Sequence, residues 1–438
     1  MLKRLWRIRA PARRAVRATT ERGVESVGIG SRPAELGPGA VTRATVILIA
    51  LRVGYAYNWF DVGPALVPIG SAFGVGPAEW GLLVAAFLVG AGLLQVPAGL
   101  LARRFGPRAV SLWGVGLLAA AGTASAFSPN FLVLLALRLA AGFGAALFFS
   151  PAIGLVASLY PSGRRGLPVG TFSSAFSLGA ALGVLGTSLL LPAIGWRDSL
   201  LFGGVLLGAL TLLGIALIPR AAGAPPRGPP VRGVPTALRF RGVWAVGFAF
   251  VGIEGASFAT GQFIVPWGVT VQGWTLALAG AIGTLFVLPS LFGGPVGGPI
   301  AERFRNHRTQ FVIATVVSGV LLALLPFAGL AETIAIGIVF SFSYGFVYAV
   351  MYVLPHYWRS VPSAEVPLAI GLFNSIQLAG GAAVSFLFGW IVAATSYSFA
   401  WIVLGLACVV TLAALIALPP TPPADADGPR AAAELVPP

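Results

Sequence analysis

The segment GLLARRF, residues 99–105, returns 199 residues later as GPIAERF, residues 298–304. Each copy comes directly after an apolar run, and each ends in an arginine followed by a phenylalanine. A repeat at this distance divides the chain into two similar halves. It predicts a protein built from two copies of one unit, with any central binding site at the interface between the halves.

The composition excludes a soluble protein. Of the 438 residues, 57% are apolar and only 9% are charged, and the mean hydropathy is +0.90. Soluble globular proteins carry roughly 25% charged residues. A soluble enzyme, a disordered protein and a fibre are therefore excluded for the chain as a whole, and an integral membrane protein remains.

Twelve apolar runs are long enough to cross a bilayer, since one crossing takes about 20 mostly apolar residues. The runs are 44–70, 79–101, 109–127, 131–157, 167–191, 197–219, 242–270, 276–300, 309–328, 332–357, 367–393 and 397–418. They predict an all-α integral membrane fold with twelve transmembrane helices in two pseudo-symmetric six-helix bundles.

The same runs predict five regions and an orientation. The regions are a basic tail (1–43), a first bundle (44–219), a linker rich in proline and arginine (220–241), a second bundle (242–418) and a second tail (419–438). The net charge is +15, and 25 of the 28 basic residues fall in the tails and in the loops on their side. Only Arg197 falls in the opposite loops. Cytoplasmic loops carry such an excess, so we predict a multi-pass protein of the cell membrane with both termini in the cytoplasm.

No cofactor or metal is expected. Cys408 is the only cysteine, and the two histidines, His307 and His356, are isolated from one another. These counts exclude a cysteine-based metal site and a zinc cluster. No P-loop is present, so the chain has no ATPase of its own. The expected partners are a small-molecule substrate, the lipid bilayer and a coupling proton, without nucleic acid, and the expected state is a monomer.

Three motifs together resemble the major facilitator superfamily over about residues 44–418. Residues 99–108 (GLLARRFGPR) are similar to the family signature G-x-L-a-D-r-x-G-r-r, and residues 138–145 (RLAAGFGA) are similar to R-x-x-x-G-x-G-A. Residues 195–198 (GWRD) lie at the outer end of the fifth span, where the family often has G-W-R. The resemblance implies a secondary transporter, not an enzyme, whose two halves rock about a central site.

The resemblance also implies gating roles in the loops. These fall on Gly99, Arg103, Arg104, Gly106 and Arg108 of the first copy, on Glu302 and Arg303 of the second copy, and on Arg138 of the fourth span. Arg103 replaces an acidic residue that helps the family lock its halves together, whereas the second copy keeps an acid at Glu302. We therefore expect the second copy to carry more of this lock.

A finer resemblance is to the organic-anion:cation symporter and nitrate-porter branches. It rests on Pro151, on YPSGRRG at residues 160–166 and on Gly170. The fifth span lacks the Gly-Pro signature of many drug:proton antiporters. Both observations favour an anionic substrate over drug export.

Four ionisable residues lie within predicted spans, where a charge costs roughly 2.5–3.5 kcal/mol on insertion scales. Arg52 is predicted to anchor an anion, because its fork matches a carboxylate; the alternative is a side chain that snorkels to the inner interface. Glu254 and Asp61 are predicted to carry the coupling proton. The alternatives are a structural hydrogen bond or salt bridge for Glu254 and a hydrated outer position for Asp61. Arg138 either accepts an anion or modulates the pKa of a carboxylate, or has a general gating or structural role.

Uncharged polar side chains at mid-depth complete the predicted substrate site. They are Tyr55, Asn58, Trp59, Gln262, Tyr344, Tyr348, Asn374 and Gln377. Tyr55 and Trp59 share the helix face of Arg52 by their i+3 and i+4 spacing. The alternative for each of these side chains is a hydrogen bond between helices.

The leading hypothesis is proton-coupled symport of a small organic or inorganic anion by alternating access. The alternative within transport is proton-coupled efflux of a hydrophobic or cationic compound, in which Glu254 binds cation and proton in turn. A membrane enzyme would need clustered catalytic groups, which the sequence does not present. The repeat argues against a channel, and a non-transporting receptor on this scaffold stays open.

Overall fold

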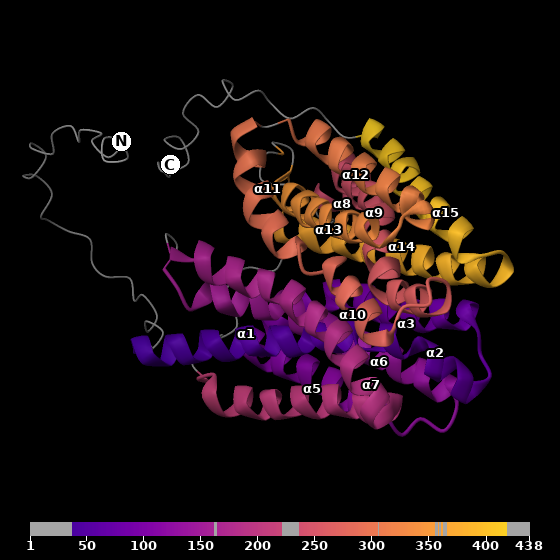
Figure 1. Cartoon of the computed structure of the whole chain (residues 1–438). Coiled ribbons are helices and arrows are strands. Elements are labelled where there is room, and N and C mark those ends of the chain that lie inside the picture. Colours follow the sequence, from indigo (N-terminus) through magenta and orange to yellow (C-terminus); the bar gives the residue numbers. More distant parts are fainter. Residues whose placement is uncertain are drawn as a thin grey trace, which may run out of the picture. The chain divides into compact units, whose positions relative to one another are not determined.

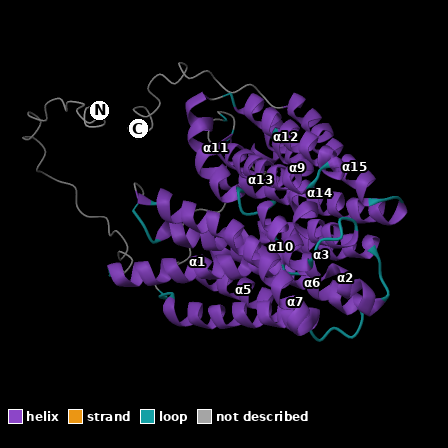
Figure 2. Ribbon diagram, in the orientation of Figure 1, coloured by secondary structure: helices purple, strands orange, loops and turns teal. Residues whose placement is uncertain are grey.

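The computed structural model describes residues 37–161, 164–220, 236–304, 306–354, 358, 361 and 366–417. Within these ranges every regular element is a helix and none is a strand (Figures 1 and 2). The predicted all-α class is therefore confirmed. Most of the first predicted tail (1–36), all of the second (419–438), most of the linker (221–235) and His356 lie outside the described residues.

The first half begins with one nearly continuous span, α1 and α2, and one bent span, α3 and α4. Its helices are α1 (Pro38–Phe60), α2 (Val62–Phe73), α3 (Pro77–Leu93), α4 (Gln95–Phe105), α5 (Pro107–Ser125), α6 (Phe131–Ser158) and α7 (Gly166–Leu217). Asp61 alone separates α1 from α2, and α4 is bent by 44° from α3. The 52-residue α7 contains two spans, because Gly195 takes a φ of 78° and interrupts the helix. Gly195 belongs to the GWRD motif, so the motif marks this break.

The second half repeats this plan with one broken span. Its elements are α8 (Thr236–Arg239), α9 (Arg241–Thr270), α10 (Leu276–Leu285), α11 (Ser290–Phe304), α12 (His307–Leu324), α13 (Leu330–Val353), α14 (Val366–Ala394) and α15 (Tyr397–Thr411), with 3-10 turns at Leu325–Phe327 and Leu412–Ala417. The helices α10 and α11 together occupy the predicted eighth span. The GPIAERF repeat ends α11, as GLLARRF ends α4.

The described part of the chain holds nine helices that are long and apolar enough to cross a membrane, or ten if the bent pair α3 and α4 forms one span. That count takes α7 as one helix and leaves out α5. Each of the twelve predicted runs is helical over most of its described length. The membrane-protein prediction and its twelve segments therefore agree with the structure.

The two halves share one helix contact in detail. Gly90 of α3 and Gly142 of α6 lie so close together that a Cβ on either would meet backbone atoms of the other helix. Gly293 of α11 and Gly345 of α13 make the same contact 203 residues later (90 to 293 and 142 to 345). Small residues allow such close approach of helices in a membrane. The internal repeat therefore extends from the loop motif to the packing of the helices.

The halves meet where α3 packs on α14, α7 on α10, and α2 on α9, and side chains of α1 and α9 also touch. Gln262 donates through Nε2 to the carbonyl of Trp59 over 2.7 Å, and the rings of Phe60 and Phe258 stack with centroids 5.7 Å apart. A Cβ on Gly63 would lie 3.0 Å from the Cα of Gln262. These contacts lie at the end of α1 farthest from its first turn. In the predicted orientation, the halves are therefore closed against each other on the outer side.

Replacing Gly142 with alanine is expected to destabilise the protein, because the new Cβ would meet the carbonyl of Phe87. Overpacking of this kind costs about 1–3 kcal/mol. Gly154→Ala on the same helix is the control, since no atom lies within 4 Å of its added Cβ and alanine favours a helix. Melting temperatures in detergent measure both variants. Equal melting would contradict the close approach of α3 and α6.

Candidate functional site

Arg52 of α1 is enclosed by aromatic rings. Its side chain is 5% exposed, and its Cζ lies 4.4 Å from the ring centre of Phe149, 4.6 Å from Tyr55, 4.7 Å from Phe176 and 5.6 Å from Phe172. Its Nε and Nη1 atoms have no hydrogen-bond partner among the described residues. Aromatic faces attract a cation but leave its in-plane N–H donors unused. Such enclosure favours the anion-anchor interpretation over snorkelling.

The helical spacing brings three predicted site residues together on α1. The ring centres of Tyr55 and Trp59 lie 5.3 Å apart, and Tyr55 lies under the Arg52 guanidinium. Trp59 then stacks on Phe258 of α9, with centroids 5.3 Å apart and an interplanar angle of 28°. The aromatic face that begins at Arg52 therefore continues to the second half of the protein.

Two predicted site amides bind helix carbonyls. Asn58 donates through Nδ2 to the carbonyls of Gly54 and Gly203, at 2.9 and 3.1 Å. Gln262 donates to Trp59, as described above. Asn58 thus joins α1 to α7 inside the first half, and Gln262 joins the two halves. Their side-chain oxygens have no hydrogen-bond partner among the described residues.

Glu254 lies on α9 and is 3% exposed. Its Oε2 accepts a hydrogen bond of 2.9 Å from the hydroxyl of Tyr344 on α13. The described residues place no cation in an ion pair with it. The structural hydrogen bond considered from the sequence is therefore present, whereas the salt bridge is not seen in the described part of the chain.

A second hydrogen-bonded group includes Tyr352, which the sequence analysis missed. Its hydroxyl donates to Asn374 Oδ1 over 2.9 Å and lies 2.9 Å from the hydroxyl of Tyr348. Gln377 Nε2 donates to the same Asn374 oxygen over 2.7 Å. Tyr344, Tyr348 and Tyr352 recur every four residues, so helical periodicity could have identified Tyr352 together with the other two.

Asp61 and Arg138 form a buried ion pair inside the first half. Arg138 Nη1 lies 3.7 Å from Asp61 Oδ1, and both side chains are at most 5% exposed. The same Nη1 donates to the carbonyl of Asn58 over 3.1 Å, and the guanidinium covers the ring of Phe87 at 4.6 Å. Asp61 is therefore enclosed, unlike the hydrated position that the sequence left open. Of the four ionisable residues in the spans, these two neutralise each other.

Arg108 and Gly106 position the loop motif. Arg108 donates through Nε to the carbonyl of Ile218 and through Nη2 to that of Ile215, each over 2.8 Å. It thereby satisfies carbonyls at the C-terminal end of α7, where a cation is also favoured by the helix dipole. Gly106 has a φ of 88° between α4 and α5, a conformation that favours glycine.

The exposed residues of the two motif copies take similar positions. Arg104 covers the ring of Phe105 at 5.1 Å, and Arg303 covers that of Phe304 at 5.6 Å. Arg103 and Glu302, which correspond in the repeat, are both exposed, and an added Cβ at Gly99 would meet no atom within 4 Å. The gating roles and the lock at Glu302 remain predictions.

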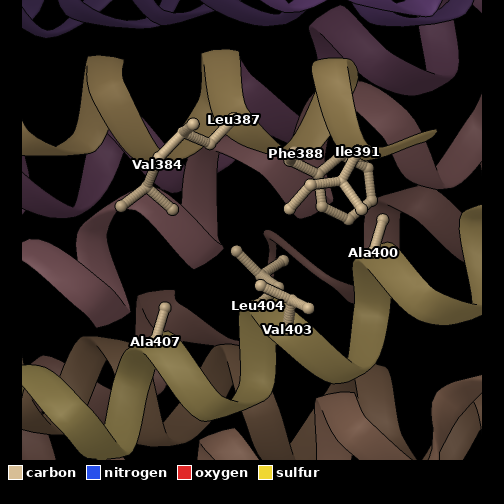
Figure 3. Close-up of a pocket in the computed structure, with 8 residues that line it drawn as sticks. All are labelled: Val384, Leu387, Phe388, Ile391, Ala400, Val403, Leu404 and Ala407. Atoms are coloured by element: carbon tan, nitrogen blue, oxygen red, sulfur yellow. The ribbon is translucent and has the colours of Figure 1, made fainter. Parts of the chain in front are cut away.

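An apolar pocket lies apart from these polar groups, between α14 and α15 (Figure 3). It is lined by Val384, Leu387, Phe388, Ile391, Ala400, Val403, Leu404 and Ala407. It offers no charged or hydrogen-bonding side chain to an anion. The described ranges also contain no group of three or more histidine, cysteine, aspartate or glutamate residues that could hold a metal ion.

The sequence profile of the Major Facilitator Superfamily matches residues 48–358 and 263–437. The chain belongs to the major facilitator superfamily. This is a family of membrane transporters, so the prediction of a transporter rather than an enzyme is confirmed.

Two solved structures share the fold. A D-xylose–proton symporter has a TM-score of 0.70 at 16% identity, over 87% of this chain and 98% of that chain. A bacterial homolog of the human lysosomal transporter Spinster, inward-facing and occupied, has a TM-score of 0.68 at 17% identity, over 89% of this chain and 96% of that chain.

Similar proteins within the superfamily are named for anionic substrates. The probable nitrate/nitrite antiporter NarK1 of Thermus thermophilus is 27% identical over 280 residues, which are 60% of this chain and 62% of that protein. The 4-hydroxybenzoate transporter PcaK of Pseudomonas aeruginosa is 32% identical over 161 residues, which are 37% of this chain and 35% of that protein. The chain therefore spans less than two thirds of the length of either relative.

Asp61→Asn and Arg138→Gln are each expected to destabilise the protein by about 3–5 kcal/mol, because each leaves one buried charge unpaired. The double variant is expected to lose less than the sum, because both charges are then absent. Denaturation in detergent measures the four proteins, with Asp198→Asn, at an exposed position, as a control. Strictly additive losses would show that the two side chains do not interact.

Proposed function

We propose that this chain is a transporter of the cell membrane that moves a small anion by alternating access. One observation carries the proposal: Arg52 is a buried cation whose Nε and Nη1 atoms have no hydrogen-bond partner among the described residues. A charge buried without a partner is costly. An anion bound at the free edge of the guanidinium would remove that cost through charge-assisted hydrogen bonds, which can be bidentate.

Among the charged residues in the spans, Arg52 is the one suited to bind an anion. Arg138 is already paired with Asp61, so its charge is compensated inside the protein. Arg52 has no such carboxylate among the described residues. Its aromatic walls come from α1, α6 and α7 of the first half, and Trp59 extends them to Phe258 of the second half. A site between two halves is what rocking about an interface requires.

The names of the similar proteins also support a negatively charged substrate. One is named for nitrate and nitrite, and another for 4-hydroxybenzoate. Nitrate and a carboxylate are both planar anions whose two oxygens match the fork of an arginine. We therefore propose a planar oxyanion as substrate, either inorganic or organic.

We further propose that Glu254 carries the coupling proton and that transport is uptake. Glu254 is buried, and its only described polar contact is the hydroxyl of Tyr344. Because an isolated buried carboxylate is costly when charged, Glu254 is suited to take up a proton. An anion on Arg52 and a proton on Glu254 would then enter together without net charge.

Arg52→Ala is expected to abolish anion binding. A ligand at 100 times its Kd stabilises a protein by about 2.7 kcal/mol, so nitrate or 4-hydroxybenzoate should raise the melting temperature of the wild-type protein in detergent. The shift should disappear in Arg52→Ala, because the anion loses its cation. Arg43→Ala, at an exposed position of the same helix, should keep it.

The same screen tests the alternative of efflux. Hydrophobic cations that stabilise the wild-type protein and Arg52→Ala equally, but not Glu254→Gln, would overturn the anion proposal. The buried carboxylate of Glu254 and the nearby rings of Tyr344 and Phe250, 6.1 Å apart, are the features that would serve such a cation.

Glu254→Gln is expected to abolish accumulation driven by a pH gradient, because glutamine cannot take up a proton. Exchange of labelled for unlabelled anion should continue, since Arg52 still binds the substrate. Proteoliposomes loaded at one pH and diluted into another measure both activities. Glu332→Gln, at an exposed position on α13, is the control. If Glu254→Gln accumulated the anion as the wild type does, another group would have to carry the coupling proton.

A further inference from the structure

We propose that the inner corner of the first half binds the headgroup of an anionic phospholipid. The inner corner comprises Arg104, Phe105, Arg108, Trp113 and Arg220, which lie on α4, on α5 and just after α7. The first copy of the loop motif supplies three of these residues. None of the five belongs to the site around Arg52, so the inference goes beyond the proposed function and does not depend on it.

Two arginines meet at the inner end of α7. Arg108 donates to the carbonyls of Ile218 and Ile215, as described above. Arg220 follows Ile218 by two residues, so the two Cα atoms lie within about 7 Å of each other. The two bonds use two of the five N–H donors of the Arg108 guanidinium, and the side chain of Arg220 is exposed. Both arginines therefore have donors to offer to an oxyanion at this helix end.

A third arginine lies beside two exposed aromatic rings. Arg104 covers the ring of Phe105, and the rings of Phe105 and Trp113 have centroids 5.3 Å apart at an interplanar angle of 62°. Phe105 is 44% exposed and Trp113 is 53% exposed. Exposed tryptophan is typical of the membrane–water interface, where its ring lies at the level of the headgroups. The two rings therefore indicate that Arg104 lies at the depth of the lipid phosphates.

The surface next to the inner corner is apolar. Leu117 on α5 and Leu212 and Ile215 on α7 are exposed, and each lies farther into its predicted span than the arginines do. A partner that fits both parts has an anionic group joined to apolar chains, as a phospholipid does. A free phosphate ion or an acidic peptide would leave the apolar part uncovered.

No acid of the first half competes for these arginines. Between residues 37 and 220 the sequence holds three acids, Asp61, Glu79 and Asp198. Asp61 is paired with Arg138, and Glu79 and Asp198 lie at the predicted outer ends of their spans. The cytoplasmic leaflet carries anionic lipids that attract arginines near its surface. Lipid phosphates are therefore the anions within reach of the inner corner.

The second copy of the repeat lacks this arrangement. At the 199-residue offset, Arg303 and Phe304 correspond to the first arginine–phenylalanine pair, but His307 and Val312 take the places of the second arginine and of the tryptophan. His307 is fully buried, and Glu302 comes directly before Arg303. The second copy thus keeps one arginine beside a ring, with an acid next to it. It offers a matched control within the same chain.

The test is the apparent affinity of the full-length protein in a neutral detergent for dioleoylphosphatidylglycerol, measured from the melting temperature as the lipid is titrated. An arginine near the surface contributes about 1 kcal/mol, so Arg104→Gln and Arg220→Gln should each weaken the affinity about fivefold. Arg303→Gln should bind the lipid like the wild type. All three side chains are exposed, so the melting temperatures without lipid should agree.

Three outcomes would overturn the inference. Equal stabilisation by dioleoylphosphatidylcholine would show that the negative headgroup is not recognised. Equal weakening in Arg303→Gln would show a general attraction to the basic inner surface and not a site at this corner. Equal stabilisation by inorganic phosphate at the same concentrations would show that the arginines bind a free anion and not a lipid.

Discussion

Inside a bilayer, a backbone amide without a hydrogen-bond partner costs several kcal/mol, and no water is present to supply one. This constraint determines most of the structure. It makes every described regular element helical, and it requires a partner for the carbonyls where helices end. Arg108 supplies that partner for the end of α7, and Arg197 donates to the carbonyls of Ala126 and Ser128 at the end of α5. Helices whose backbone groups are all hydrogen-bonded can then pack closely at glycines, as α3 and α6 do at Gly90 and Gly142.

In the same interior of low polarity, each of the few charges in the spans is costly unless another charge compensates it. Arg138 and Asp61 compensate each other's charge within the first half, where α1 meets α2. Arg52 and Glu254 have no such partner among the described residues and lie in different halves of the protein. A transporter needs this kind of incomplete arrangement, because a substrate or a proton has to complete it. We therefore expect Arg52 and Glu254 to serve transport. We expect Arg138 and Asp61 to stabilise the fold.

Much of the fold was accessible from the sequence. Hydropathy located all twelve segments, the GLLARRF repeat revealed the two halves, and GWRD marked the break in α7 at Gly195. The site was predicted in part. Helical spacing put Tyr55 and Trp59 with Arg52, because neighbours on one helix depend only on local geometry. Asn58 and Gln262 were chosen for depth and polarity, yet their amides bind carbonyls of other helices, which spacing along one helix cannot show. Tyr352 escaped because its hydrogen bond to Asn374 joins two helices.

The sequence by itself determined the class of protein and its membership of the major facilitator superfamily, because these depend on apolar run length and on short motifs. Only the tertiary structure decided how the buried charges are partnered. Arg138 forms an ion pair with Asp61, whereas Arg52 is surrounded by aromatic rings, although all three residues lie in apolar runs of similar composition. The physical reason is that pairing depends on which faces of separate helices meet. That depends on side-chain packing across the whole bundle and not on the order of residues within one span.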